Sequence, residues 1–517
     1  MHKSEKLSAS FGLTAVCLAA TLLAGCVGSA SQSVRNILPG QLSADQPVLA
    51  QVNRSYAATS GAIGAEQDRY HNQSVGLGLI SHPEAERYIN QQLVKLKQAS
   101  GIQGLPGQAY LFADTSYGTR SSADGNIYIP YVMLHELDST DELAALLARE
   151  LGHTIRNHNG IDLFDQLQQK GMMAAEVFGS MGGGDARAKD PTQERLAEIL
   201  NAMSVADGFI NPGWSRRQDQ EADRLGLDLL ISAGYNADAM FTLLDKMDRW
   251  NTRNKEQMSL RTSSIEQLLL ASGLALTDLP FVESINNFLD QSFGQLGSVL
   301  NRFTSDGSTQ GRQDGLRTYV RSHYAAAPSP ALETRSWRNI SQAQKTQRIS
   351  RSLTQVVQAR DAAVQGDLSN AEKLLRTAVN PDTNHQNFLR QSFHELRAAQ
   401  NNQQGMRQNV NLAMRGQYPS FQIHVEQARL AGEANPASTR GLIRTFEQYG
   451  KPPAYYLPVV TMAEKSQLAS EALRLHTECA AKSLGQGFAC NTAGSAGAGT
   501  GVAETAYNAL FKALAPK

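Results

Sequence analysis

One short stretch of the chain brings together a carboxylate and an imidazole that could act on the same molecule: Arg149-Glu150-Leu151-Gly152-His153. In the motif H-E-x-x-H, two histidines four residues apart lie on one helix face and bind a zinc ion, while the glutamate is the general base for the metal-bound water. Glu150 and His153 fit this pattern, but Arg149 stands where the first histidine would be. A guanidinium stays protonated and has no lone pair to offer a metal. The stretch therefore predicts a zinc-site helix in which one ligand has been replaced.

The residues around this stretch are predicted to form the helix that positions it. Ser139 and Glu142 make a capping-box pattern, which marks a helix start, and Gly160 is expected to end the helix. The buried stripe is expected to comprise the apolar residues at helical spacing: Leu143, Leu146, Leu147, Leu151 and Ile155. Residues 108–113 and 126–130 are typical of strands, and the segment between them is rich in turn-forming residues.

Three segments of the chain, in order, resemble the zinc metallopeptidase family of HtpX, the CAAX prenyl endopeptidase and BepA (peptidase family forty-eight). The segments are residues 141–158, Arg217-Gln-Asp-Gln-Glu-Ala-Asp-Arg-Leu-Gly with Ala233-Gly-Tyr-Asn-Ala-Asp-Ala-Met after it, and Ser322-His323 with Arg335 downstream. In the third segment Tyr324 replaces the family's proline and the spacing is stretched. The resemblance implies an α+β, mainly helical fold, with a zincin-like metallopeptidase domain over residues 56–345.

The resemblance also implies roles for individual residues. Glu150 matches the family's general base, and His153 matches its second zinc ligand. Asp219 matches the position of the third ligand, where the family has glutamate, and Asp223 matches the aspartate that supports this ligand from one turn away. His323 matches a histidine that can approach the metal site.

The sequence leaves two states of this site open. In the first, Arg149 occupies the vacated metal position and pairs with Asp219 and with carboxylates beside it, so that ion pairs replace the metal as a cross-link. In the second, zinc is held by His153, Asp219 and His323, with water in the fourth position. The cofactor is therefore zinc if the site is functional, and none if it is not. We expect the first state, because a guanidinium repels a divalent cation.

Residues near the motif are expected to support the fold. His158 is expected to be structural, and Glu221 is expected to be a solvated charge on a helix surface. Ala222 and Gly226 would permit close packing of their helix against its neighbour. Residues 303–315 are rich in glycine and polar groups, which indicates a mobile excursion.

The N-terminus carries an export signal. Residues 1–25 have a short polar start with two lysines and then an almost wholly apolar run, which ends in Leu23-Ala-Gly-Cys26. This ending resembles the lipobox of bacterial lipoproteins, which implies cleavage before Cys26 and a lipid on its thiol that anchors the protein to a membrane. Val27, in place of aspartate, favours the outer membrane, with the protein facing the periplasm. Residues 26–55 are expected to be a flexible tether.

The C-terminal part is predicted to be helical over residues 346–485. Its small residues followed by leucines resemble tetratricopeptide helix pairs, but no clean 34-residue period is visible. A degenerate repeat array and a plain helical bundle therefore remain equally open. Residues 486–517 are expected to form a flexible tail with a short amphipathic helix. Cys479 and Cys490 are expected to form a disulfide, because exported proteins meet an oxidising compartment.

The composition and the resemblance together limit the function. The chain has 517 residues, and Lys+Arg and Asp+Glu each total 48, so a zero net charge gives no support for a nucleic-acid partner. The resemblance implies an envelope quality-control lipoprotein with a metalloendopeptidase-like domain, and we expect that domain to be impaired or inactive because Arg149 replaces the first zinc histidine. Its partners would be misfolded or unassembled envelope proteins, or the outer-membrane assembly machinery, and an extended client would pair with strand 126–130 as an edge strand. The alternatives are an active zinc metalloendopeptidase with altered ligands, and a structural lipoprotein with one fixed partner.

Overall fold

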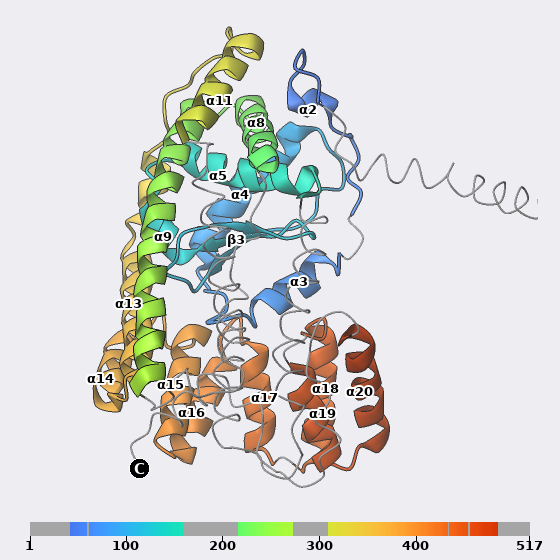
Figure 1. Cartoon of the computed structure of the whole chain (residues 1–517), viewed down its shortest axis with the longest axis vertical. Coiled ribbons are helices and arrows are strands. Elements are labelled where there is room, and N and C mark those ends of the chain that lie inside the picture. The colour runs from blue at the N-terminus through green and yellow to red at the C-terminus, as the bar shows by residue number, and fades with distance from the viewer. Residues whose placement is uncertain are drawn as a thin grey trace, which may run out of the picture. The chain divides into compact units, whose positions relative to one another are not determined.

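The structure is a computed structural model (Figure 1) that describes residues 42–58, 62–158, 216–271, 309–432, 434–452 and 455–483. The chain divides into two compact units, Met1–Val52 and Asn53–Lys517. In the first unit, the described residues contain one helix, α2 (Val48–Gln51). The second unit contains the sheet and the other described helices. The predicted signal sequence, Cys26 and the predicted tail at residues 486–517 lie outside the described residues.

A three-stranded sheet packs against the helix that carries the motif. Its strands are β1 (Ala109–Phe112), β2 (Arg120–Ser121) and β3 (Ile127–Pro130), in the spatial order β1-β3-β2. β1 runs parallel to β3, and β2 runs antiparallel to it. The two strands predicted from the sequence are therefore confirmed. β3 is central, however, so the prediction that residues 126–130 form an edge strand is wrong. Among the described strands, β2 forms the edge that contacts the motif helix.

The motif helix, α5, is surrounded by helices from distant parts of the chain. The helices that pack against one another here are α4 (Pro83–Ser100), α5 (Thr140–Ile155), α8 (Arg216–Ser232), α9 (Asp238–Ala271) and α11 (Thr309–His323). The short elements of this region are α3 (Ala65–Asn72), η1 (Tyr131–His135) and α12 (Arg335–Ser341). Figure 1 shows α9 as the long green helix beside α5. Every residue of α5 from Thr140 to Thr154 is buried, so its charged side chains must find partners inside the protein.

The start of α5 follows the prediction, and its end does not. The Ser139 side chain accepts a hydrogen bond from the Glu142 backbone N–H at 3.1 Å, which is the first half of a capping box. The Glu142 carboxylate in turn accepts from the backbone N–H of Asp138 at 2.7 Å. The helix ends at Ile155, before the predicted stop at Gly160, because Asn157 adopts a left-handed conformation with φ of 55°.

The C-terminal helices form consecutive hairpins. Their bounds are α13 (Gln344–Val364), α14 (Leu368–Ala378), α15 (Asn387–Ala399), α16 (Gln403–Ala413), α17 (Phe421–Leu430), α18 (Pro436–Gln448), α19 (Tyr456–Lys465) and α20 (Ala469–Ser483). Each odd-numbered helix packs against the even-numbered helix that follows it, and α15, α17 and α19 also pack against the hairpin before them. We call residues 344–483 the helical array; Figure 1 shows it in orange and red.

A repeat spacing is visible in the helical array, although the sequence showed no clean period. Helices α15, α17 and α19 begin at residues 387, 421 and 456, and helices α16, α18 and α20 begin at residues 403, 436 and 469. These starts are separated by 33 to 35 residues, close to the 34-residue period of tetratricopeptide repeats. The period is hidden in the sequence because side-chain types vary while hairpin lengths stay the same. Membership of the tetratricopeptide class stays a prediction.

The loop between α3 and α4 joins the sheet to the helical array. On the sheet side, Ile80 N–H donates to the Leu111 carbonyl at 2.9 Å, which extends the sheet beyond β1. On the array side, the Gln386 amide bonds both backbone groups of Ser81, donating to its carbonyl at 2.8 Å and accepting from its N–H at 3.0 Å. Asn387 donates to the Leu77 carbonyl at 3.1 Å. Backbone groups of this loop therefore bond the array beside the sheet, and Tyr418 of the array adds an apolar contact with Leu79 and Tyr128.

Three segments differ in extent or structure from their predicted bounds. The predicted tether at 26–55 contains α2, and its last residues belong to the second unit, where Gln103 N–H donates to the Arg54 carbonyl at 2.9 Å. The boundary predicted between residues 345 and 346 lies inside that same compact unit. Residues 309–315, part of the expected excursion, are the first half of α11. Among the described residues, no helix combines the length and the apolar character needed to cross a bilayer.

Candidate functional site

Two glycines let α5 and α8 approach closely enough for their side chains to share one cluster. A Cβ atom on Gly152 would lie 3.0 Å from the carbonyl oxygen of Ala222. A Cβ atom on Gly226 would lie 3.1 Å from the backbone nitrogen of Arg149. Contacts this short are tighter than most Cβ contacts, so a larger residue at either position would push the two helices apart. The close packing expected from Ala222 and Gly226 is therefore present.

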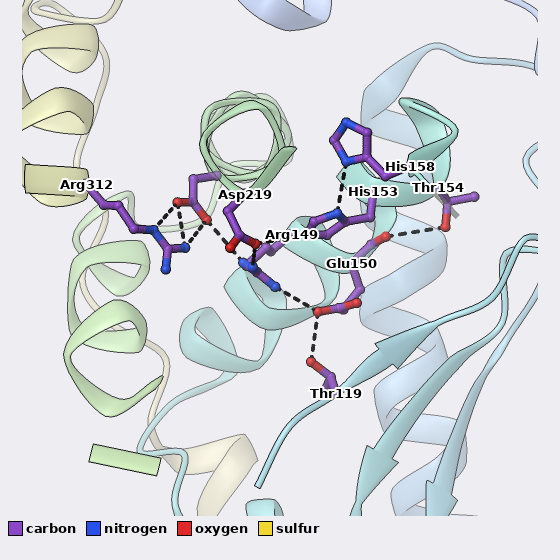
Figure 2. Close-up of polar contacts among 9 residues, drawn as sticks. Thr119, Arg149, Glu150, His153, Thr154, His158, Asp219 and Arg312 are labelled. Carbon is purple, nitrogen blue, oxygen red and sulfur yellow. Dashed lines mark hydrogen bonds and ion pairs between the residues drawn. The ribbon is translucent and has the colours of Figure 1, made fainter. Parts of the chain in front are cut away.

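Arg149 is the centre of the cluster, which Figure 2 shows. Its guanidinium forms an ion pair with Asp219 through Nη2, and its Nε donates to Asp223 Oδ1 at 3.1 Å. Its Nη1 donates to Glu150 Oε1 at 3.1 Å. Arg149 is only 4% exposed, and Glu150 and Asp223 are each 1% exposed. The ion pair that the sequence predicts between Arg149 and Asp219 is therefore present, and two further carboxylates join it.

Arg312 is a second arginine at this cluster, and sequence reasoning missed it. It comes from α11 and forms a two-point contact with Asp223: its Nε lies 2.9 Å and its Nη2 2.7 Å from Oδ2. The same Nη2 lies 2.9 Å from Oδ1. The surrounding sequence, Thr-Gln-Gly-Arg-Gln-Asp-Gly, contains two glycines and was expected to lie in a mobile excursion. No local signal in it points to a buried ion pair.

Glu150, at the position of the general base, is tied to the sheet as well as to Arg149. Thr119, just before β2, donates its hydroxyl to Glu150 Oε1 at 2.9 Å (Figure 2). Burial raises the pKa of Glu150, while Arg149 and the Thr119 hydrogen bond oppose that rise. The carboxylate oxygen that faces Arg149 therefore already accepts two hydrogen bonds. Thr119 could not be identified from the sequence, because it lies in the turn-rich segment between the strands.

His153 and His158 lie against each other. Their Nδ1 atoms are 2.9 Å apart, and both side chains are fully buried. Burial, followed by the positive charge of Arg149, holds the pKa of His153 well below its usual range, so its imidazole is neutral. His153 Nε2 lies 3.7 Å from Asp219 Oδ1. The predicted pair of ligands, His153 and Asp219, is thus brought together, and His158 supports His153.

Glu221 is not the solvated surface charge that was expected. It is 6% exposed and pairs with Arg156 at 3.0 Å, Arg217 at 2.9 Å and His158 at 3.5 Å. Burial would raise its pKa, but the bonds from His158 and the arginines lower it to about 2. The prediction failed because a helix pattern alone does not show that the end of α5 covers this face of α8.

His323 is not brought to the cluster. Its ring meets that of Tyr319 edge to face, with ring centroids 4.7 Å apart. On α11 it lies eleven residues beyond Arg312, which is roughly 16 Å along a helix with a rise of about 1.5 Å per residue. Tyr324, which replaces the family's proline, donates its hydroxyl to Asp228 of α8 at 2.9 Å. Of the three predicted metal ligands, the structure therefore assembles two.

A comparison with family models now identifies this region. Residues 83–323, from α4 to the end of α11, match the model of peptidase family M48. These residues form an M48 peptidase domain. The model covers the two segments that carry Arg149, Glu150, His153 and Asp219, and it ends before the helical array.

Curated relatives agree with this assignment. The beta-barrel assembly-enhancing protease of Escherichia coli (strain K12) is 24% identical over 283 residues, which cover 52% of this chain and 57% of the relative. The metalloprotease YcaL of Escherichia coli (strain K12) is 25% identical over 248 residues, which cover 47% of this chain and 89% of the relative. The chain thus matches little more than half the length of the first of these proteins.

The residues of this M48 domain do not fit a zinc ion. The family is generally zinc-dependent, but here the charged guanidinium of Arg149 lies among the carboxylates that would face the metal. Burial disfavours that charge, yet Asp219, Asp223 and Glu150 outweigh it and raise the pKa of Arg149, so it stays protonated. Within the described ranges, no group of three or more His, Cys, Asp or Glu side chains is arranged to hold a metal. A metal would have to displace Arg149 first.

The predicted cysteine sites lie mostly outside the described residues. Cys479, in α20, is 6% exposed and is disulfide-bonded. Its expected partner, Cys490, and the lipidation site, Cys26, are not among the described residues. The pairing of Cys479 with Cys490 therefore stays a prediction.

Proposed function

We propose that this protein is an envelope quality-control factor that binds misfolded or unassembled envelope proteins without cleaving them. One observation carries the proposal: Arg149 lies at the position of the first zinc histidine and is ion-paired to Asp219, Asp223 and Glu150. A zinc peptidase needs three protein ligands and an open fourth position for water. Here the side chain that replaces one ligand also fills the space between the helices.

The same contacts weaken Glu150 as a general base. A base must be free to take a proton from an attacking water, within about 2.6–3.2 Å. Glu150 Oε1 instead accepts hydrogen bonds from Arg149 and Thr119. The carboxylate is therefore held by groups of the protein itself, which suits a structural role.

The client-binding part of the proposal is supported by the sheet edge and by the relatives. β2 has a strand partner on one side only among the described strands, and it lies beside Thr119. An extended client segment can pair with such an edge through backbone hydrogen bonds. A relative of this chain is named as a protease that enhances beta-barrel assembly. We propose that this chain acts on similar clients, held at the outer membrane by a lipid on Cys26.

The test combines metal analysis with cleavage. Purified protein is expected to contain zinc far below one ion per chain and to leave denatured casein intact, with or without chelator. Glu150→Gln is the matched control, because it should change neither the zinc content nor the fate of casein in a protein that does not cleave. Stoichiometric zinc that is lost on His153→Ala, together with chelator-sensitive cleavage, would show that the protein is an active zinc endopeptidase.

A second experiment addresses the partners. Crosslinking in cells followed by capture of the full chain is expected to recover many different envelope proteins. Recovery of a single protein in constant ratio would instead indicate a structural lipoprotein with one fixed partner.

A further inference from the structure

We propose that Arg149 and Arg312 replace the metal ion as the mechanical link of this domain, by tying α5, α8 and α11 together through Asp223. We call these three side chains, with Asp219, the guanidinium node. The inference rests on one part of the proposed function, that the native cleft holds no zinc. It adds that the arginines are required for the stability of the domain.

Arg149 can link α5 to α8 in the way that a metal ion would. A metal bound by side chains from two helices cross-links them, and a bidentate or multiply bonded arginine can do the same with directional hydrogen bonds. Arg149 on α5 reaches Asp219 and Asp223, which lie one turn apart on α8. A single side chain therefore holds two successive turns of the neighbouring helix.

Asp223 is shared between Arg149 and Arg312. Its Oδ1 accepts from Arg149 Nε at 3.1 Å and from Arg312 Nη2 at 2.9 Å. Its Oδ2 accepts from Arg312 Nε and Nη2 at 2.9 Å and 2.7 Å. A carboxylate has about four acceptor positions, so the two guanidiniums use the whole of its capacity. Asp223 thus connects three helices that are far apart in the sequence.

The two arginines also compensate the charge of buried carboxylates. Two guanidiniums face Asp219, Asp223 and Glu150, all of which are 6% exposed or less. Removing one guanidinium would leave buried carboxylates without a compensating charge, which is far more costly than losing an exposed pair. Arg217 of α8 offers a comparison, because its side chain is 62% exposed and its partner Glu221 would keep Arg156 and His158.

The experiment measures thermal unfolding of the full mature chain. Arg149→Met and Arg312→Met are each expected to lower the apparent Tm by on the order of 10 °C, with Arg217→Met lowering it by no more than a few degrees. The double variant Arg149→Met with Asp219→Asn should recover part of the loss, because it removes both charges of one pair. A loss in Arg149→Met no greater than that in Arg217→Met would overturn the proposal.

A second variant keeps the proposal testable if Arg149→Met does not fold. Arg149→His places two imidazoles four residues apart, opposite Asp219, which is a set of ligands for zinc. Zinc is expected to raise the Tm of this variant, and a chelator should reverse the gain, whereas neither should change the Tm of the natural protein. An Arg149→His variant indifferent to zinc would contradict a link at the metal position.

The two proposals can fail separately. A natural protein that holds no zinc and leaves casein intact, but whose Tm falls no more on Arg149→Met than on Arg217→Met, would overturn the guanidinium node alone. A natural protein that cleaves casein, with a Tm that depends on Arg149 and ignores chelator, would overturn the proposed function and leave the node intact.

Discussion

The M48 domain and the helical array both bury charged side chains, but they connect them differently. In the M48 domain, Arg149 pairs with residues 70 and 74 positions away, and Arg312 pairs with a residue 89 positions away. All of these pairs meet at one point. In the array, the Arg360–Glu395 and Arg348–Asp382 pairs span 35 and 34 positions, about one repeat, and share no residue.

The two regions therefore arrange their buried ion pairs in different ways. Stacked hairpins contact only their neighbours, so each buried pair in the array stabilises one interface. The M48 cluster gathers its charges because α5 and α8 pack closely at Gly152 and Gly226, with α11 beside them. The carboxylates concentrated there are neutralised by Arg149 and Arg312. The following predictions test this contrast, from the largest expected effect to the smallest.

The largest effect is expected for Asp223→Asn. Asp223 is 1% exposed and bonds two arginines, so we expect the free energy of unfolding to fall by about 3–5 kcal/mol. Glu395→Gln in the array should cost less, because Glu395 meets one arginine, Arg360. Urea unfolding followed by circular dichroism measures both, and Asp314→Asn, with a 60% exposed side chain, is the control. Equal losses in the free energy of unfolding for Asp223→Asn and Glu395→Gln would contradict the difference between the two regions.

A smaller effect is expected from the glycines. Gly152→Val would push a branched side chain against the backbone of Ala222 and should cost about 1–3 kcal/mol. Gly315, in α11, has open space around its Cβ position, so Gly315→Ala should stabilise by roughly 0.5–1 kcal/mol through helix propensity. The same urea unfolding assay should show a lower free energy of unfolding for Gly152→Val and a higher one for Gly315→Ala. A neutral Gly152→Val would mean that α5 and α8 can move apart freely.

Loss of one helix cap should affect the array alone. Asn435 accepts hydrogen bonds from Ala437 N–H at 3.1 Å and Ser438 N–H at 3.2 Å, so Asn435→Ala should cost about 1 kcal/mol. Hydrogen exchange should become faster in α18 and its neighbours, and stay unchanged in α5. Asn435→Ser, which retains a capping oxygen, is the control. Faster exchange in α5 would show that the array and the M48 domain unfold together.

The smallest effect is a pH dependence of array stability. Burial opposes charge on His394, but Glu426 at 3.3 Å and then Glu395 outweigh it and raise its pKa above the ordinary 6.5. Burial also opposes charge on Glu426, and His394 outweighs it and lowers that pKa below 4.5. The histidine's contribution is full below pH 6.5 and is lost as pH rises through its folded pKa.

The glutamate's contribution has the opposite sign. It is present above pH 4.5 and is lost as pH falls through the lowered pKa, so the pair stabilises most between about pH 4.5 and 6.5. Unfolding of the natural protein and of His394→Gln, measured from pH 4 to 9, should show the decline above pH 6.5 only in the former. An identical pH profile for both proteins would contradict a charged His394.

The sequence predicted what local patterns encode. The cap at Ser139 and the strands at β1 and β3 follow from spacing and side-chain chemistry, whereas the ion pair of Arg149 with Asp219 was implied by the resemblance to the metallopeptidase family. Thr119 and Arg312 could not be predicted, because turn-rich and glycine-rich segments do not show which buried group they will meet. The burial of Glu221 and the central position of β3 were missed for the same reason. Each depends on which element packs against it, and tertiary contacts decide that.

The loop that holds the array has a practical consequence for dissecting this protein. A chain cut after residue 345 would remove Gln386 and Asn387, the partners of the Ser81 and Leu77 backbone groups. It would also uncover Leu79 and Tyr128, which pack with Tyr418 in one apolar cluster. The isolated N-terminal part would thus expose an apolar surface and backbone groups that have lost their hydrogen-bond partners, both beside its own sheet. To purify the peptidase-like part alone, the apolar residues of that surface should first be replaced by polar ones. Shortening the chain without such replacements would leave the surface exposed.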